Sequence, residues 1–117
     1  MKKVIATTSA PGAIGPYSQA IDTGTFVFAS GQIPLNPATG EIPEGIQAQT
    51  AQSLANVCAI LEAAGLTVDN VVKTTVFLSD MANFAAMNDV YGKVFTEPYP
   101  ARSAVAVREL PKGVLVE

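Results

Sequence analysis

Arg102 opens the valine-rich stretch "RSAVAVREL", which directly follows the segment "EPYPA". The chain has only seven lysines and arginines, and this one stands at the edge of a predicted strand. A guanidinium can hold a carboxylate through two parallel hydrogen bonds. Arginine also forms ordinary surface ion pairs, and the residue type alone leaves both interpretations open. Arg102 is therefore a candidate carboxylate-binding residue.

Glu117 ends the valine-rich segment "VLVE". A carboxylate in this position could orient or deprotonate a water molecule, or it could be a solvated strand end. The sequence has no histidine and one cysteine, Cys58, which excludes Ser-His-Asp and Cys-His catalysis, an intrachain disulfide and a Cys/His zinc site. The spacing of Cys58 places it on the apolar stripe of a helix, as expected for a core residue.

Three other segments offer polar or aromatic groups for a binding site. Gly31 follows Ser30 directly after a predicted strand, and glycine lets a ligand approach the backbone closely. Tyr17 follows a Gly-Pro pair and could line a pocket or cap the core. Phe84 and Asn88 are four residues apart and share one face of a predicted helix. Each of them also has a purely structural interpretation: a turn, a core contact or an exposed amide.

The elements that must position these candidates alternate in type. The pattern predicts a hairpin that turns at Thr23-Gly24, a long loop after Ser30, and a helix whose apolar stripe includes Leu54, Val57 and Leu61. Two helices for about six strands favour an α+β sandwich, a mixed sheet with both helices on one face. The expected strands are 2–6, 18–22, 25–30, 71–78, 101–109 and 114–117, and the expected helices are 46–64 and about 82–95.

The predicted strands are apolar on both faces in 25–30 and 71–78. An antiparallel sheet that is open to water on one side should have a polar face there, so another subunit is expected to cover the face opposite the helices. In the strand from 101, alternation separates Arg102 and Ala104 from Val105 and Val107. The valines are expected to face the helices, which would place Arg102 at the rim of a subunit interface.

The length of 117 residues predicts a single domain, residues 1–117, and 49% of the residues are hydrophobic, enough for a folded core. The net charge of −3 and the scattered cations argue against a nucleic-acid partner. The N-terminus lacks the apolar core of a signal peptide, and no run approaches the length of a membrane span. We therefore expect a cytoplasmic protein with no membrane partner.

Several segments together resemble one known family. "GAIGPYSQAI", "FASGQIPLNPATGEIP", "VVKTTVFLSDMANFAAMNDVYGKVF" and "YPARSAVAVRELPKGVLVE" occur in the order found in the reactive-intermediate deaminases, also called RidA- or YjgF-like proteins. The similarity runs from near residue 3 to Glu117. It implies a chorismate-mutase-like fold and a homotrimer with clefts between neighbouring subunits.

The resemblance also implies a reaction. By its resemblance to this family, the protein is expected to hydrolyse 2-imino acids, such as 2-iminobutanoate and 2-iminopropanoate, to 2-oxo acids and ammonia. These imines arise from enamines that pyridoxal-phosphate-dependent dehydratases release. The family needs no metal or other cofactor, so none is expected here, and the expected partner is the small 2-imino or 2-oxo acid.

Matched residue by residue, Arg102 corresponds to the family's carboxylate-binding arginine and Gly31 to its second carboxylate contact. Glu117 corresponds to the glutamate that orients water. The family's pocket-lining positions correspond to Tyr17, Ser30 and Asn88 of this chain. We add Phe84 to the expected substrate-binding residues, because it shares the helix face of Asn88.

The chain departs from the family pattern in three places. Ala104 stands where members often have cysteine, the segment 96–101 looks shorter, and the tail that usually follows Glu117 is not in the sequence. Two other functions remain alternatives to imine hydrolysis. One is a non-catalytic, regulatory trimer that binds small carboxylates. The other, which the acidic composition disfavours, is an endoribonuclease or translation inhibitor.

Overall fold

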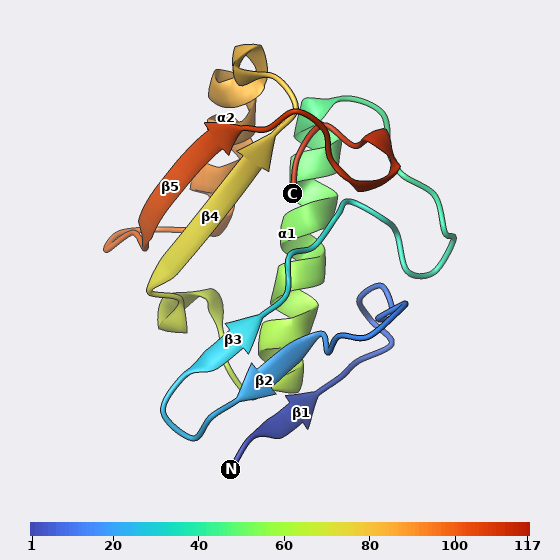
Figure 1. Cartoon of the computed structure of the whole chain (residues 1–117). Coiled ribbons are helices and arrows are strands. Elements are labelled where there is room, and N and C mark those ends of the chain that lie inside the picture. Colours follow the sequence, from blue (N-terminus) through green and yellow to red (C-terminus); the bar gives the residue numbers. More distant parts are fainter.

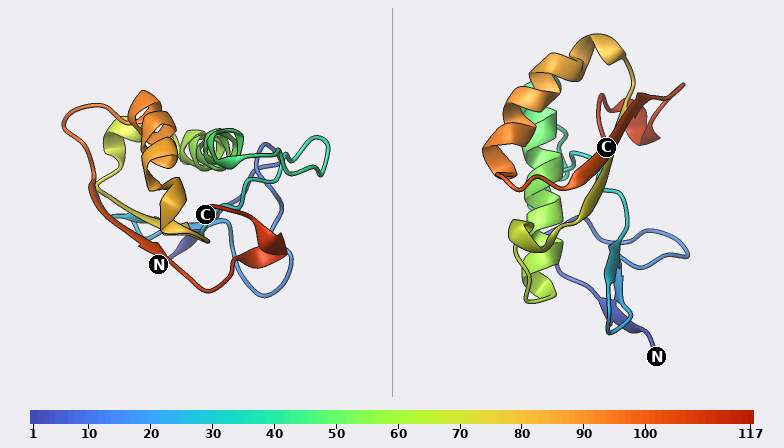
Figure 2. Two further views of the ribbon diagram at one scale, coloured as in Figure 1. Left: turned by 90° about the horizontal axis from the view of Figure 1, so that it is seen from above. Right: turned by 90° about the vertical axis from the view of Figure 1, so that its left-hand side faces the viewer.

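The computed structural model describes residues 1–117 and contains two small sheets packed against two helices. Both helices lie on the same side of the strands, as Figure 2 shows from two directions. α1 extends behind both sheets, and α2 packs against α1 behind the second sheet (Figure 1). The strands are β1 Lys3–Ile5, β2 Ala20–Asp22, β3 Val27–Ala29, β4 Lys73–Leu78 and β5 Ala101–Ala106, and the helices are α1 Ile46–Ala63 and α2 Phe84–Val94.

The first sheet is antiparallel, in the order β1-β2-β3, and the second is the parallel pair β4-β5. The predicted hairpin is confirmed: β2 and β3 pair, and the Thr23 N–H donates to the Phe26 carbonyl across the turn. The loop predicted after Ser30 is confirmed as well, because no strand or helix lies between β3 and α1. The α+β class and the placement of both helices on one face are as expected.

The expected single sheet of about six strands is not what the structure shows. It has five strands in two sheets, and 114–117 forms only an isolated antiparallel bridge, Val116 to Leu78. Glu117 exchanges two backbone hydrogen bonds of 2.9 Å with Phe77, so the segment has begun to pair with β4. This segment pairs with β4 alone, so the two sheets are not joined through it.

Helix α1 has the predicted length but a different buried face. It begins after Gly45 (φ +89°) and is followed by Gly65 (φ +74°), both conformations that glycine favours. Its most buried residues are mainly polar: Gln49, Thr50, Ser53 and Asn56. Three of them hold backbone groups of other segments. Asn56 donates to the Ile33 and Leu35 carbonyls, Ser53 donates to the Gln32 carbonyl, and Gln49 accepts from the Leu115 N–H.

The predicted apolar stripe of α1 is only half-buried. Leu54, Val57 and Leu61 are of intermediate exposure and line a hollow between β3 and β4. The core lies on either side of this hollow. One cluster is centred on Leu78, Met87 and Phe95, and a smaller one includes Ile5, Ala20 and Ile60.

The expected orientation of β5 is wrong. Ala104 packs against the core cluster under α2, and Arg102 points to the same side, whereas the Val105 side chain is 46% exposed on the outer face. Alternation correctly separates the two sets but does not say which set meets the helices. α2 offers two aromatic rings to the guanidinium, and the small Ala104 lets the helix pack closely.

The outer face of the sheets is apolar, as expected. Phe28, Phe26 and Val4 are 64%, 57% and 57% exposed, Val4 and Phe28 lie on either side of Ile21 in the β1-β2-β3 register, and the two phenylalanine rings meet edge to face. Isolated surface hydrophobics are ordinary, but a group on neighbouring strands is typical of a surface that meets a partner. Neither helix combines the length and hydrophobicity of a membrane span.

Candidate active site

Arg102 lies on β5, beside Thr74 of β4 in the parallel register, with its side chain directed under α2. Its Nη1 donates a 2.8 Å hydrogen bond to Asn88 Oδ1. The guanidinium carbon lies 4.7 Å from the Tyr91 ring centre and 5.5 Å from that of Phe84. Within the chain, α2 therefore brings three of the predicted site residues together: Arg102, Asn88 and Phe84.

The partner of Arg102 is a neutral amide, so its charge is not consumed by a carboxylate of the same chain. The aromatic rings attract the cation and restrict its orientation. Most of its N–H donors remain available to an incoming anion. The arrangement can therefore hold a small carboxylate in a defined orientation.

Tyr91 and Thr74 support this group, and sequence analysis did not identify either of them as site residues. The Tyr91 hydroxyl and Thr74 Oγ1 are 2.7 Å apart and hydrogen-bonded, with Tyr91 only 7% exposed. The signal was present for Tyr91, because it lies three residues after Asn88 and seven after Phe84. The same spacing also describes a core stripe, so the sequence alone does not distinguish a site residue from a core residue at this position.

A second group forms where β3 ends. Gly31 abuts the Glu117 carboxylate so closely that a Cβ at residue 31 would lie 2.8 Å from Oε2 and 3.0 Å from the carboxyl carbon. Ser30 is held by a 2.7 Å hydrogen bond from its hydroxyl to the Ser18 carbonyl. The predicted residues Ser30, Gly31 and Glu117 thus lie together, and Gly31 is needed here because it has no side chain.

Tyr17 precedes Ser18 in the loop before β2, and its side chain is 52% exposed. The chain path therefore places Tyr17 next to the Ser30 group. No hydrogen bond joins its hydroxyl to another predicted site residue within the chain.

The two groups are separated within one chain. Arg102 is in register with Thr74 at one edge of β4, whereas Glu117 pairs with Phe77 at the other edge. The spacing between neighbouring strands and the rise per residue along a strand place the backbones of Arg102 and Glu117 about 14 Å apart. The Arg102 side chain, moreover, points toward α2. One chain therefore does not bring Arg102 and Glu117 to a single substrate.

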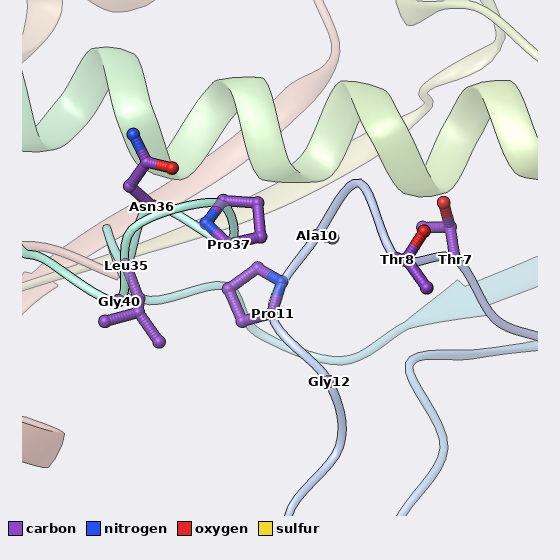
Figure 3. A pocket seen from close by; sticks show the side chains of 9 residues that line it. All are labelled: Thr7, Thr8, Ala10, Pro11, Gly12, Leu35, Asn36, Pro37 and Gly40. Atoms are coloured by element: carbon purple, nitrogen blue, oxygen red, sulfur yellow. The ribbon is translucent and has the colours of Figure 1, made fainter.

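Two hollows accompany these groups. The larger, of about 760 Å³, lies between β3 and β4 and is lined by Ser30, Gly31 and Glu117, but not by Arg102. The smaller, of about 290 Å³, lies between the loops 7–12 and 35–40 (Figure 3). No ionisable side chain lines the smaller hollow, so we assign no chemistry to it.

The remaining titratable candidate is Cys58, which is half-buried on α1. Desolvation by burial raises the pKa of its thiol above the ordinary value, so the thiolate is disfavoured. This agrees with its interpretation as a packing residue. No group of three or more His, Cys, Asp or Glu residues is placed to hold a metal ion.

Comparison with known proteins gives consistent results. The family model described as endoribonuclease L-PSP matches residues 7–117. The 2-iminobutanoate/2-iminopropanoate deaminase of Escherichia coli K12 is 55% identical over 120 residues, covering 100% of this chain and 94% of that protein. A RutC family protein of Pyrococcus horikoshii is 58% identical, with the same two coverages. The crystal structure of E. coli TdcF with bound serine superposes with a TM-score of 0.94 at 53% identity, covering 97% of this chain and 92% of that one.

Proposed function

We propose, from the premise that this chain belongs to the endoribonuclease L-PSP family and shares the Rid fold, that it hydrolyses reactive 2-imino acids to 2-oxo acids and ammonia. The full-length identity to a 2-iminobutanoate/2-iminopropanoate deaminase makes the chain an enzyme of this deaminase type. The observation that carries the specific reaction is Arg102, whose guanidinium is oriented by Asn88 and two rings and has no carboxylate partner in the chain.

The reaction needs little activation. Arg102 holds the substrate carboxylate and fixes the position of the neighbouring imine carbon. Glu117 orients a water molecule, whose oxygen bonds to that carbon while the imine nitrogen gains a proton. The carbon–nitrogen bond of the resulting carbinolamine then breaks, ammonia leaves with its electron pair, and the hydroxyl loses its proton to give the 2-oxo acid. The reaction is a hydrolysis and requires no redox partner.

The complete site lies between subunits of a homotrimer in this proposal. One subunit supplies Arg102, Asn88 and Phe84, and its neighbour supplies Tyr17, Ser30, Gly31 and Glu117. The separation of the two groups within one chain and the exposed apolar face around Phe28 support this assembly. The serine bound to TdcF is consistent with a family site that accepts small amino-acid-like carboxylates.

A coupled assay tests the proposal. A threonine dehydratase generates 2-iminobutanoate, semicarbazide traps the surviving imine, and the protein competes with the trap. The wild type and Arg108→Ala, which removes an exposed arginine two residues beyond β5, should lower the yield of trapped adduct. Arg102→Ala should not lower it. If semicarbazide yields as much adduct with the wild type as without protein, the reaction assigned here is wrong, and a carboxylate-binding role replaces it.

A further inference from the structure

The segment that leaves β3 is held through its carbonyl groups. Ser53 and Asn56 of α1 donate to three of these carbonyls where the segment passes along the helix (Figure 1). The carbonyls of Ser30 and Gly31 are held in a different way, by the side chain of Gln32. Its Nε2 lies 3.2 Å from each of the two oxygens. Gln32 is thus a polar residue of the site region that the proposed mechanism does not yet use.

Gln32 is buried, and both of its donors are committed. Its exposed fraction is 7%, although glutamine is mostly found at protein surfaces. An amide nitrogen carries two hydrogens, and here each of them meets one carbonyl oxygen. The opposite placement of the amide would set its oxygen against the two carbonyls with no hydrogen between them, so the hydrogen-bond network fixes the assignment. The side chain therefore holds two successive peptide groups in one orientation.

The orientation of the two carbonyls determines that of the next N–H groups. In a trans peptide, the C=O and N–H of one peptide group point in opposite directions, and both peptides here are trans. Because the Ser30 carbonyl faces the Gln32 amide, the Gly31 N–H points away from that amide. No group of the chain accepts a hydrogen bond from the Gly31 N–H. Gly31 is itself exposed, so a ligand can reach this donor.

We propose that Gln32 is a positioning residue that aims the Gly31 N–H at the substrate carboxylate. This role rests on the proposed function, in which Arg102 of one subunit and Gly31 of its neighbour bind that carboxylate. A backbone N–H has no rotamers of its own, so its direction depends on the peptide plane that Gln32 holds. The Glu117 carboxylate abuts Gly31 but accepts no hydrogen bond from its N–H, which leaves the donor to the substrate.

Gln32→Met tests this role, because it keeps the length of the side chain and removes both donors. The contact between Gly31 and the carboxylate is made in the bound substrate and in the transition state alike. The KM for 2-iminobutanoate should therefore rise by about tenfold while kcat stays within about twofold of the wild type. The semicarbazide competition assay, run over a range of dehydratase rates, gives both constants.

Ser53→Ala is the matched control. It removes the hydrogen bond to the backbone carbonyl of Gln32, which holds the same segment to α1, and leaves the Gln32 side chain in place. Its KM should stay within about twofold of the wild type. An equal rise of KM in Ser53→Ala and Gln32→Met would show that only the firmness of the segment matters, and would overturn the role of the Gln32 amide.

An NMR titration observes the donor directly. In the complete ¹⁵N-labelled protein, 2-oxobutanoate, the expected product, should move the amide proton of Gly31 downfield, as a charge-assisted hydrogen bond does. The same shift is expected in Ser53→Ala, and a much smaller one in Gln32→Met at saturating ligand. A Gly31 amide that does not move in the wild type overturns the role, even if Gln32→Met does not fold.

The assay also separates this role from the reaction itself. A wild type that does not lower the yield of trapped adduct overturns the proposed function, and the role of Gln32 with it. An active wild type whose KM is unchanged in Gln32→Met overturns the role of Gln32 alone.

Discussion

Arg102 combines a fork of hydrogen-bond donors with a planar cation that rests on the rings of Tyr91 and Phe84. Lysine has the same charge but neither the fork nor the flat surface. Replacing Arg102 by lysine therefore keeps the electrostatic attraction and removes the orientation. Such a replacement separates the two contributions to substrate binding.

We expect Arg102→Lys to lower kcat/KM for 2-iminobutanoate by about tenfold to a hundredfold, the equivalent of one charge-assisted hydrogen bond. The measurement is competition with semicarbazide over a range of dehydratase rates. Circular dichroism should show an unchanged fold. An Arg102→Lys enzyme as active as the wild type would contradict the oriented, two-point binding of the carboxylate.

Gly31 offers a test of the second group. In Gly31→Ala the new methyl group would lie 2.8 Å from Glu117 Oε2, so the carboxylate must move. A displacement of this order in a water-positioning group is expected to lower kcat by about a hundredfold. Gly12→Ala is the matched control, because no atom lies within 4 Å of a Cβ there. Equal activity of the two variants would remove Glu117 from the site.

At the scale of elements, α1 holds the long loop through polar side chains. Asn56 is 1% exposed, and its amide donates hydrogen bonds of 3.0 Å to the carbonyls of both Ile33 and Leu35. These bonds fix the path of the segment that leaves Gly31. A buried amide at this position therefore links the helix to the candidate site.

Asn56→Ala should lower the free energy of unfolding by about 2 kcal/mol, because two partly buried carbonyls lose their donor. Urea denaturation of this variant, compared with Gln47→Ala at an exposed position of the same helix, measures the difference. The control should stay within about 0.5 kcal/mol of the wild type. A similarly small change for Asn56→Ala would show that water or other groups replace the amide.

The sequence predicted the elements better than their faces. The helical period of the apolar residues and the positions of the glycines correctly placed α1 and the hairpin, since both signals are local. The buried side of α1 was missed because Asn56 and Ser53 are buried by contacts with a distant loop, which no local pattern encodes. The face of β5 was missed for the same reason. The group around Arg102 was largely predicted, but Tyr91 was not, because an aromatic residue at helical spacing fits a core equally well.

At the scale of the whole molecule, the group around Arg102 and the group around Glu117 lie apart in each chain. In the proposed trimer, the two groups of neighbouring subunits form one shared site. This makes complementation possible. In a random mixture of Arg102→Ala and Glu117→Gln chains, a cleft has both wild-type groups when its two contributing chains are of the right kinds. The chance is about one in four for a cyclic assembly.

The mixed protein, prepared by co-refolding equal amounts of the two variants, should therefore recover about a quarter of the wild-type rate, whereas each variant alone has little activity. The semicarbazide assay measures the rate, and sedimentation shows the assembly. No recovery in assembled mixtures would place both groups in one chain's site. Such a result would contradict the shared cleft while leaving the reaction itself open to the Arg102→Ala test.

Tyr91 gives the protein an optical property that the wild-type chain displays without a label. The sequence contains three tyrosines and no tryptophan, and Tyr91 is the buried tyrosine, at 7% exposure, whereas Tyr17 and Tyr99 are more than half exposed. Its ring lies against the guanidinium and its hydroxyl is held by Thr74. An anion that docks on Arg102 changes the electric field across that ring. Near-ultraviolet absorption can therefore report how full the proposed carboxylate site is, in real time and at equilibrium, even for compounds that the enzyme does not convert.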